Sequence, residues 1–203
     1  RDLDSLYGQK VLKESSDLGL EYTLDLLKKY QLTDEEMFKA FDYAKSKNII
    51  PLCTPWDEIS LNKLEKYGLS AYKISSADLT NHPLIESVAK TCKPIFLSTG
   101  MSNEAEVIKS FSLLKQLSAK FIPLQCNSTY PVPMSDINLA YMLRLKELSG
   151  SLVGYSGHER GFEVCIAAVA MGGKVIEKHF SIDKEMEGND HKVSLLPEEF
   201  GSM

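Results

Sequence analysis

Short runs of β-branched and aromatic residues alternate with amphipathic stretches along most of this 203-residue chain. The runs follow one another about every 20 to 30 residues, a spacing typical of βα units around a parallel sheet. Six runs are predicted to be strands: Ile49–Cys53, Ala71–Ser75, Pro94–Ser98, Phe121–Cys126, Leu152–Tyr155 and Lys174–His179. This alternation predicts an α/β fold in which helices cross over between parallel strands.

Capping residues predict where several helices begin and end. Thr33 and Glu36 form a capping box, in which each side chain satisfies a backbone N–H of the first turn. Asn103 and Glu106 can act in the same way before a second apolar stretch. Pro83 suits the first turn of a helix, because its missing N–H is not needed there. Two glycines are expected just after helix ends: Gly68 and Gly150.

Periodicity alone does not choose between an open doubly wound sheet and an eight-stranded barrel. Polar residues cluster at the C-terminal ends of nearly every predicted strand: Thr54, Ser75, Ser76, Ser98, Thr99, Asn127, Ser128, Thr129, Ser156, His158 and His179. In a barrel all strand ends meet at one mouth, whereas an open sheet concentrates function at one switch point. We therefore expect an incomplete (β/α)8 TIM-type barrel with about six βα units.

Composition predicts one soluble globular domain and restricts its partners. The chain is 43% hydrophobic and 25% charged, and its net charge of −5 argues against binding nucleic acid or an acidic membrane. Apolar runs fall short of the roughly 18 residues of a membrane span, and the polar start is unlike a signal peptide. Four well-separated cysteines indicate reduced thiols in a cytoplasmic protein.

We expect a single synthase-type barrel domain over residues 1–203. Residues 33–200 would hold the βα units, and residues 1–32 would form a long connection that contains a short helix at Tyr22–Tyr30.

Lys73 lies within a predicted strand, in AYKISS. A lysine that points into an apolar interior is costly unless an anion meets it, so one interpretation is a ligand-facing cation with Ser75 and Ser76 as nearby donors. The other interpretation is a lysine at an edge, or one that extends outward to solvent.

His158 follows one predicted strand, and His179 is the last residue of the next one. If those strands are neighbours, about 4.8 Å apart, both imidazoles can reach one divalent ion that has open positions for water and substrate. The alternative is that each is a hydrogen-bonded loop residue. Glu177 shares the face of His179, so it either orients a ligand or pairs with Lys174 or Lys178.

Seven ordered motifs resemble the N-acetylneuraminate (sialic acid) synthase family, which includes legionaminic and pseudaminic acid synthases. They are CTPWD, YKISSADLTNHPLI, IFLSTGM, CNSTYPVP, GYSGHE, IEKHF and GNDHKVSLLPEEF. The resemblance implies a barrel transferase that condenses phosphoenolpyruvate with an N-acetylhexosamine aldehyde, such as N-acetylmannosamine, and releases phosphate. It also implies a divalent metal, Mn²⁺ with Mg²⁺ and Co²⁺ as alternatives, and a homodimer for the full-length parent.

Matching motif positions imply roles for individual residues. The implied metal ligands are His158 and His179. The implied substrate-binding residues are Thr54, Ser76, Ser98, Ser128, Tyr130, Ser156 and Asp190, with Asp190 on the sugar side. The implied catalytic residues are Lys73, Asp78 and Glu177, of which Asp78 and Glu177 are alternative proton donors. Ser128 stands where family members often have Asn, and Asp78 stands where many have Glu.

Family barrels begin with two further strands and are followed by a small antifreeze-like domain, neither of which is recognised in this sequence. We therefore expect the first two strands to be missing. An opened barrel exposes sheet edges, so the isolated chain is expected to have little or no activity. Two alternatives remain open: a legionaminate or pseudaminate synthase, and a non-catalytic binding or scaffold module.

Overall fold

The computed structural model describes residues 27–203, which divide into two compact units with the boundary between Tyr72 and Lys73. Residues 27–30 are helical, and the rest of the helix expected at Tyr22–Tyr30 lies outside the described residues. The same holds for most of the expected connection over residues 1–32.

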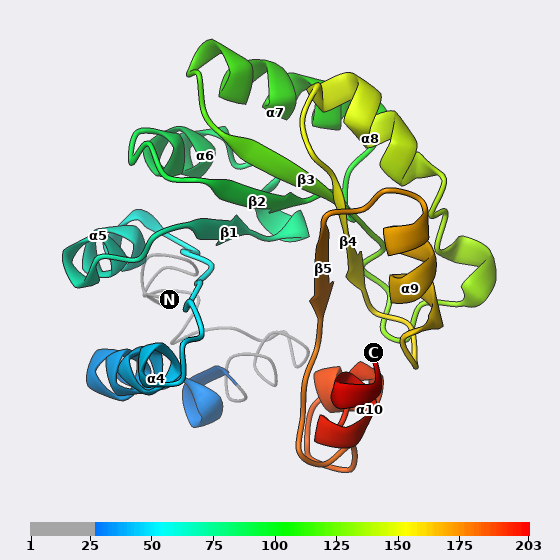
Figure 1. Cartoon of the computed structure of the whole chain (residues 1–203). Coiled ribbons are helices and arrows are strands. Elements are labelled where there is room, and N and C mark those ends of the chain that lie inside the picture. The colour runs from blue at the N-terminus through cyan, green and yellow to red at the C-terminus, as the bar shows by residue number, and fades with distance from the viewer. Residues whose placement is uncertain (1–26) are drawn as a thin grey trace, which may run out of the picture. The chain divides into compact units, whose positions relative to one another are not determined.

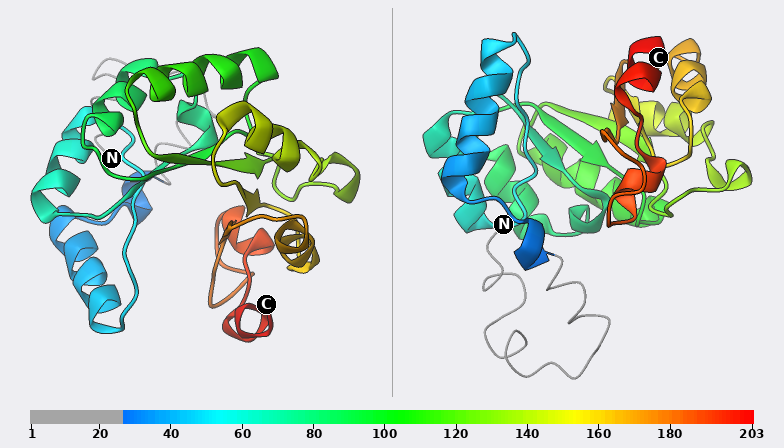
Figure 2. Two further views of the ribbon diagram at one scale, coloured as in Figure 1. Left: turned by 45° about the horizontal axis from the view of Figure 1, so that its top comes forward. Right: turned by 90° about the horizontal axis from the view of Figure 1, so that it is seen from below.

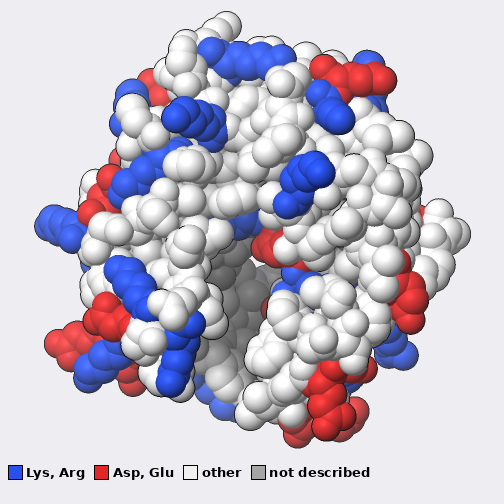
Figure 3. All heavy atoms as spheres, viewed as in Figure 1, with Lys and Arg blue, Asp and Glu red and all other residues white. Residues whose placement is uncertain are grey.

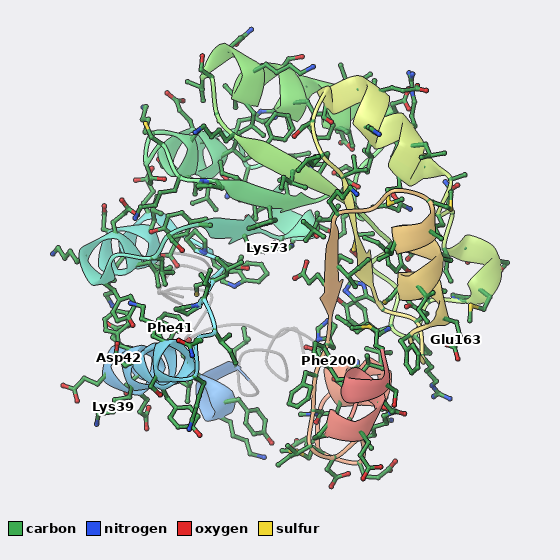
Figure 4. The ribbon with its side chains drawn as sticks, viewed as in Figure 1. Lys39, Phe41, Asp42, Lys73, Glu163 and Phe200 are labelled. Atoms are coloured by element: carbon green, nitrogen blue, oxygen red, sulfur yellow. The ribbon has the colours of Figure 1, made fainter. Side chains whose placement is uncertain are left out.

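The first unit contains helices α4 (Asp34–Ser46) and α5 (Glu58–Tyr67). The predicted capping box at Thr33 is confirmed, and Gly68 ends α5 in the left-handed conformation at φ 86°. Tyr67 stacks on Phe38 with ring centroids 4.8 Å apart, and its hydroxyl donates to Asp42 at 2.6 Å. Figure 4 labels Asp42 on α4. Aromatic packing and this hydrogen bond therefore hold the two helices together.

The strand predicted at Ile49–Cys53 is wrong. Only Cys53 forms a bridge, to Tyr72, and Ile49 and Ile50 are 61% and 72% exposed. Pro51 lies in the middle of the run and has no N–H to donate to a neighbouring strand, which is the physical reason that pairing stops.

The second unit contains a parallel sheet in the order β1-β2-β3-β4-β5. The strands are β1 (Tyr72–Ile74), which begins at the boundary, β2 (Ile95–Ser98), β3 (Phe121–Cys126), β4 (Gly154–Gly157) and β5 (Val175–Lys178). Spatial order follows chain order, so each βα unit adds its strand beside the previous one and the sheet curls in one direction (Figure 1). The five strands confirm the expected α/β class.

Helices cover one face of the sheet. The helices that follow the strands are α6 (His82–Ala89), α7 (Glu104–Gln116), α8 (Tyr141–Ser149), α9 (Glu163–Ala170) and α10 (Pro197–Ser202). The first four of them lie on the outer, convex face (Figures 1 and 2). Fully buried side chains such as Leu97, Ile85 and Leu114 form the core between this face and the helices. Short 3-10 turns lie at η1 (Ser76–Asp78), η2 (Met134–Asp136) and η3 (Asp190–Val193).

Most predicted signals in this unit are confirmed. Asn103 and Glu106 form a capping box at α7, Pro83 lies in the first turn of α6, and Gly150 ends α8 at φ 69°. The strand predicted at Leu152–Tyr155 is displaced toward the C-terminus, because Leu152 is 54% exposed and precedes the sheet.

Charged side chains of both signs are interspersed over the described surface on the face drawn in Figure 3. Within residues 27–203, no helix is both long and apolar enough to cross a membrane.

Candidate active site

Strand register brings four predicted residues onto the inner face of the second unit's sheet. Ser156 on β4 pairs directly with Glu177 on β5, and Cys126 on β3 pairs with Ser156 on its other side. Lys73 on β1 and Ser98 on β2 meet on the same face. Because side chains alternate along a strand, these residues face away from the core that the helices cover.

Lys73 on β1 contacts residues of both β2 and β5 on this face. Its Nζ atom donates to Ser98 Oγ at 2.7 Å and to the Ile74 carbonyl at 3.1 Å, and it lies 3.4 Å from Glu177 Oε2. The lysine side chain is 14% exposed and the glutamate side chain 44%. Figure 4 shows Lys73 on the inner side of the sheet. Glu177 therefore pairs with Lys73, whereas Lys178 pairs with Glu159.

The contact between Lys73 and Glu177 shows that the sheet is curved. β1 and β5 are the first and last strands in the order, and four strand spacings in a flat sheet would separate them by about 19 Å. A salt bridge between them requires the sheet to curl as a barrel wall does.

His158 and His179 lie close together at the ends of β4 and β5. Their ring centroids are 5.2 Å apart. Tyr130 stacks on His158 at 4.1 Å and places its hydroxyl 2.8 Å from Nε2 of that ring. On the other side of the ring, Nδ1 is 2.6 Å from the Asn127 carbonyl, which fixes Nδ1 as the protonated nitrogen. Asp190 lies 4.0 Å from Nδ1 of His179.

The two histidines have different acidities. Burial lowers the pKa of His158, but hydrogen bonding and charge interaction with Cys126, together with the Asn127 carbonyl, outweigh burial and raise that pKa overall. Burial also lowers the pKa of His179; the negative charge of Asp190 opposes this, and the positive charge of His158 reinforces it. The net result for His179 is a lowered pKa, which keeps its ring neutral and able to accept a proton or bind a cation.

The donor set around the two imidazoles suits a cation only in part. Among residues 27–203, no group of three His, Cys, Asp or Glu side chains is gathered as a metal site. However, a ring whose Nδ1–H is held by a carbonyl presents Nε2 outward, the usual arrangement of a histidine ligand. His158 has this arrangement, whereas Nδ1 of His179 lies 4.0 Å from the Asp190 carboxylate. Two histidine ligands would leave the remaining positions to water and substrate oxygens, provided that the Tyr130 hydroxyl moves off Nε2 of His158.

A second group of polar atoms lies beside Cys126. Ser76 Oγ accepts from the Gly100 N–H at 3.0 Å and donates to Cys126 Sγ at 3.5 Å. A Cβ atom at Gly100 would lie 2.8 Å from Ser128 Oγ and 3.0 Å from both the carbonyl oxygen and the Sγ atom of Cys126, so glycine favours the close approach of these loops. Ser76, Ser128 and Ser156 are therefore grouped around Cys126.

Two predicted residues have other surroundings. Both carboxylate oxygens of Asp78 accept hydrogen bonds from its own loop, from Ser75 at 3.2 Å and Asn81 at 3.1 Å. Thr54 belongs to the first unit and directly follows the bridging Cys53.

Sequence reasoning missed the place of Cys126 in the site and the buried pair of Glu159 and Lys178. Strand alternation could have found Cys126, because it occupies the last inward position of β3. No sequence pattern indicated that Glu159 is buried, since it follows a strand end in a polar motif.

Comparison with known proteins decides the family. A family model described as NeuB matches residues 3–203. The chain belongs to the NeuB family. Its NeuB relatives include the N,N'-diacetyllegionaminic acid synthase of Campylobacter jejuni, 41% identical over 88% of this chain and 54% of that protein. The human N-acetylneuraminate-9-phosphate synthase is 35% identical over 79% of this chain and 45% of that protein.

A solved structure agrees with the NeuB assignment. The N-acetylneuraminic acid synthetase of Leptospira borgpetersenii is 30% identical and superposes with a TM-score of 0.88, covering 98% of this chain and 66% of that one. The chain spans about half the length of the curated NeuB relatives it matches. The predicted family and the barrel-type fold are confirmed.

Proposed function

We propose that this chain forms the substrate-binding part of a synthase that condenses phosphoenolpyruvate with an N-acetylhexosamine aldehyde to give a nonulosonic acid. The observation that carries the proposal is the placement of Lys73, Glu177, His158 and His179 at the carboxyl ends of parallel strands, in a chain whose named relatives make such acids.

Lys73 and the serines are suited to hold the anionic substrate. Phosphoenolpyruvate carries a carboxylate and a phosphate, and a mostly buried ammonium group with adjacent hydroxyl donors stabilises such charges strongly. Ser98 lies within hydrogen-bond distance of Lys73, and Ser76 and Ser156 flank Cys126 on the same face. The same donors would offset the charge that develops on the departing phosphate.

The reaction balances as follows. C3 of phosphoenolpyruvate forms a bond with the aldehyde carbon, whose oxygen takes up a proton. Water adds to C2 and gives up one proton, which balances the proton taken up by the aldehyde oxygen. The C2–O bond to phosphate then breaks, the remaining C2 hydroxyl becomes a carbonyl, and its proton goes to the departing phosphate. Glu177 is the favoured group to move the proton at the aldehyde oxygen, because it is half-exposed and next to Lys73. Asp78 is less suited, since both of its oxygens are engaged within its loop.

His158 and His179 are proposed to hold a divalent cation, Mn²⁺ with Mg²⁺ or Co²⁺ as alternatives. When bound, such an ion would supply Lewis acidity toward the aldehyde oxygen. Asp190 and Tyr130, which lie beside these rings, would then contact the sugar.

The identity of the sugar distinguishes the alternatives. The relatives are named as synthases of different acids, including legionaminic, neuraminic and pseudaminic acid types, so N-acetylmannosamine and the legionaminate and pseudaminate precursors are all candidates. A scaffold without catalysis predicts no binding of phosphoenolpyruvate or metal.

The test measures phosphate release from phosphoenolpyruvate by the intact protein with each of these three sugars, with and without chelator, and repeats it for His158→Ala. We expect metal-dependent release with one preferred sugar and a loss of at least about 100-fold in the variant. Release that is unaffected by both chelator and His158→Ala would refute the metal role, and no release with any sugar would refute the synthase.

A further inference from the structure

A buried ion pair lies on the opposite side of the sheet from the two histidines. The side chains of Lys178 and Glu159 are 0% and 1% exposed, and Nζ is 3.1 Å from Oε1. The lysine also donates to the backbone carbonyl of Glu159. The hydroxyl of Tyr155 donates to Oε2 at 2.7 Å. We call these three residues, Tyr155, Glu159 and Lys178, the buried clamp.

The position of the clamp in the sequence ties it to the candidate site. Glu159 directly follows His158, and Lys178 directly precedes His179. Because side chains alternate across a strand, Lys178 faces the helices while His179 faces the inner side. The clamp therefore joins the two chain segments that carry the imidazoles, on the face that substrate does not reach.

Gly157 leaves space for the side chain of Glu159 next to β4. A Cβ atom on Gly157 would lie 2.7 and 2.8 Å from the two carboxylate oxygens of Glu159, so only glycine lets the carboxylate fold back over β4. Gly157 is also the register partner of Lys178. The thiol of Cys165 on α9 lies 3.8 Å from Oε1 and packs the helix against the pair.

A buried ion pair adds little net stability, since desolvation offsets the attraction between the charges. Its geometric effect is clearer, because two desolvated charges in contact permit little relative movement of the backbones that carry them. We infer that the buried clamp is a positioning device that sets the separation and orientation of the His158 and His179 rings. The expected effect on metal binding rests on the proposed function, whereas the expected effect on the two rings does not.

Imidazole ¹⁵N resonances of the metal-free intact protein test the inference directly. In the double variant Lys178→Met with Glu159→Gln, which leaves no uncompensated buried charge, we expect the resonances of His158 and His179 to shift and broaden. Tyr155→Phe removes a single hydrogen bond and should produce a smaller change at the same two rings. The resonances of His82 and His191 should be unchanged in both variants.

Ser110→Ala is the matched control, because it removes a buried hydroxyl that lies 3.2 Å from Nε2 of His82. It should move the His82 resonance and leave His158 and His179 unchanged. A folded clamp variant with unchanged His158 and His179 resonances would overturn the inference. So would a uniform disturbance of all four rings in Tyr155→Phe, which would indicate a general structural role.

Mn²⁺ titration of the same proteins separates this inference from the proposed function. The clamp residues do not touch the imidazoles, and they act on them only through the adjoining backbone. Removal of groups that orient metal ligands typically lowers metal affinity by about 10- to 100-fold, and we expect a loss of that size in the double variant. If the wild-type protein binds no Mn²⁺, the proposed metal role fails. The ¹⁵N resonances of His158 and His179 would still test whether the buried clamp positions the two rings. Wild-type Mn²⁺ affinity in the double variant would contradict the positioning role.

Discussion

The Nζ atom of Lys73 on β1 lies 3.4 Å from Oε2 of Glu177 on β5, although these strands stand at opposite ends of the sheet order. The contact exists because the sheet curls, and it places a cation and a carboxylate on one inner face. A substrate anion that binds Lys73 would compete with Glu177 for it. Substrate binding would therefore release the carboxylate for proton transfer.

Lys73→Met should impair use of phosphoenolpyruvate. The variant removes a mostly buried cation at the proposed anion site, so we expect kcat/KM for phosphoenolpyruvate to fall by at least about 100-fold. Steady-state kinetics at saturating sugar measure this. Lys90→Met is the control, because that lysine pairs with Glu86 at the surface and should retain full activity. An unchanged kcat/KM in Lys73→Met would remove the lysine from the anion site.

Glu177→Gln should lower kcat by about 10²- to 10⁴-fold, the usual contribution of a general acid–base group. Asp78→Asn should lower kcat by less than about tenfold while reducing stability by about 1 kcal/mol, because Asp78 anchors Ser75 and Asn81 in its loop. Comparing kcat and urea unfolding for the two variants checks the assignment. The reverse order of the kcat effects would make Asp78 the proton-transfer group.

Alkaline pH should destabilise the fold in part through Cys165. Burial, reinforced by the charge of Glu159, raises the pKa of Cys165 from about 9 to about 11. The folded state therefore keeps a proton that the unfolded chain loses, so this contribution is complete below about pH 9 and disappears between about pH 9 and 11.

Urea unfolding at pH 8 and pH 10.5 measures this effect. Cys165→Ala should lose less stability than the wild-type protein between the two values. Cys92→Ala, at an exposed position, should lose as much as the wild type. Equal losses in all three proteins would exclude Cys165 as a source of the alkaline sensitivity.

Gly154→Ala should destabilise the sheet by about 1–3 kcal/mol or more. An added Cβ would lie 2.3 Å from the Val175 carbonyl and 2.7 Å from Leu124 Cδ2, so the neighbouring strands would have to move apart. Gly201→Ala, where a Cβ meets nothing within 4 Å, should change stability by no more than about 1 kcal/mol. Thermal unfolding of both variants provides the comparison, and similar melting temperatures would contradict the packing argument.

The local elements were largely predictable. The capping residues Thr33 and Asn103 begin their helices as expected, and Gly68 and Gly150 end theirs. These predictions succeed because capping depends on hydrogen bonds between residues a few positions apart. The strand expected at Ile49–Cys53 failed because strand pairing depends on a neighbour that the local sequence does not specify.

The candidate site was predictable as a set of positions but not as a set of contacts. Polar residues after successive strands indicated one edge of a parallel sheet, which is a consequence of chain direction. The partners of Glu177 and Lys178 were not predictable, because each depends on sheet curvature or on burial.

The sequence by itself determined the α/β class, the helix ends and the residues near the carboxyl ends of the strands, since these follow from short-range pattern and chain direction. It also determined the family, through motifs that occur in order along the chain. Only the tertiary structure decided that Lys73 meets Glu177 across the curved sheet and that Glu159 meets Lys178 beneath the two histidines. The physical reason is that both contacts join different strands or the loops that follow them, and whether two charges meet depends on the curvature and packing that hold those strands in place.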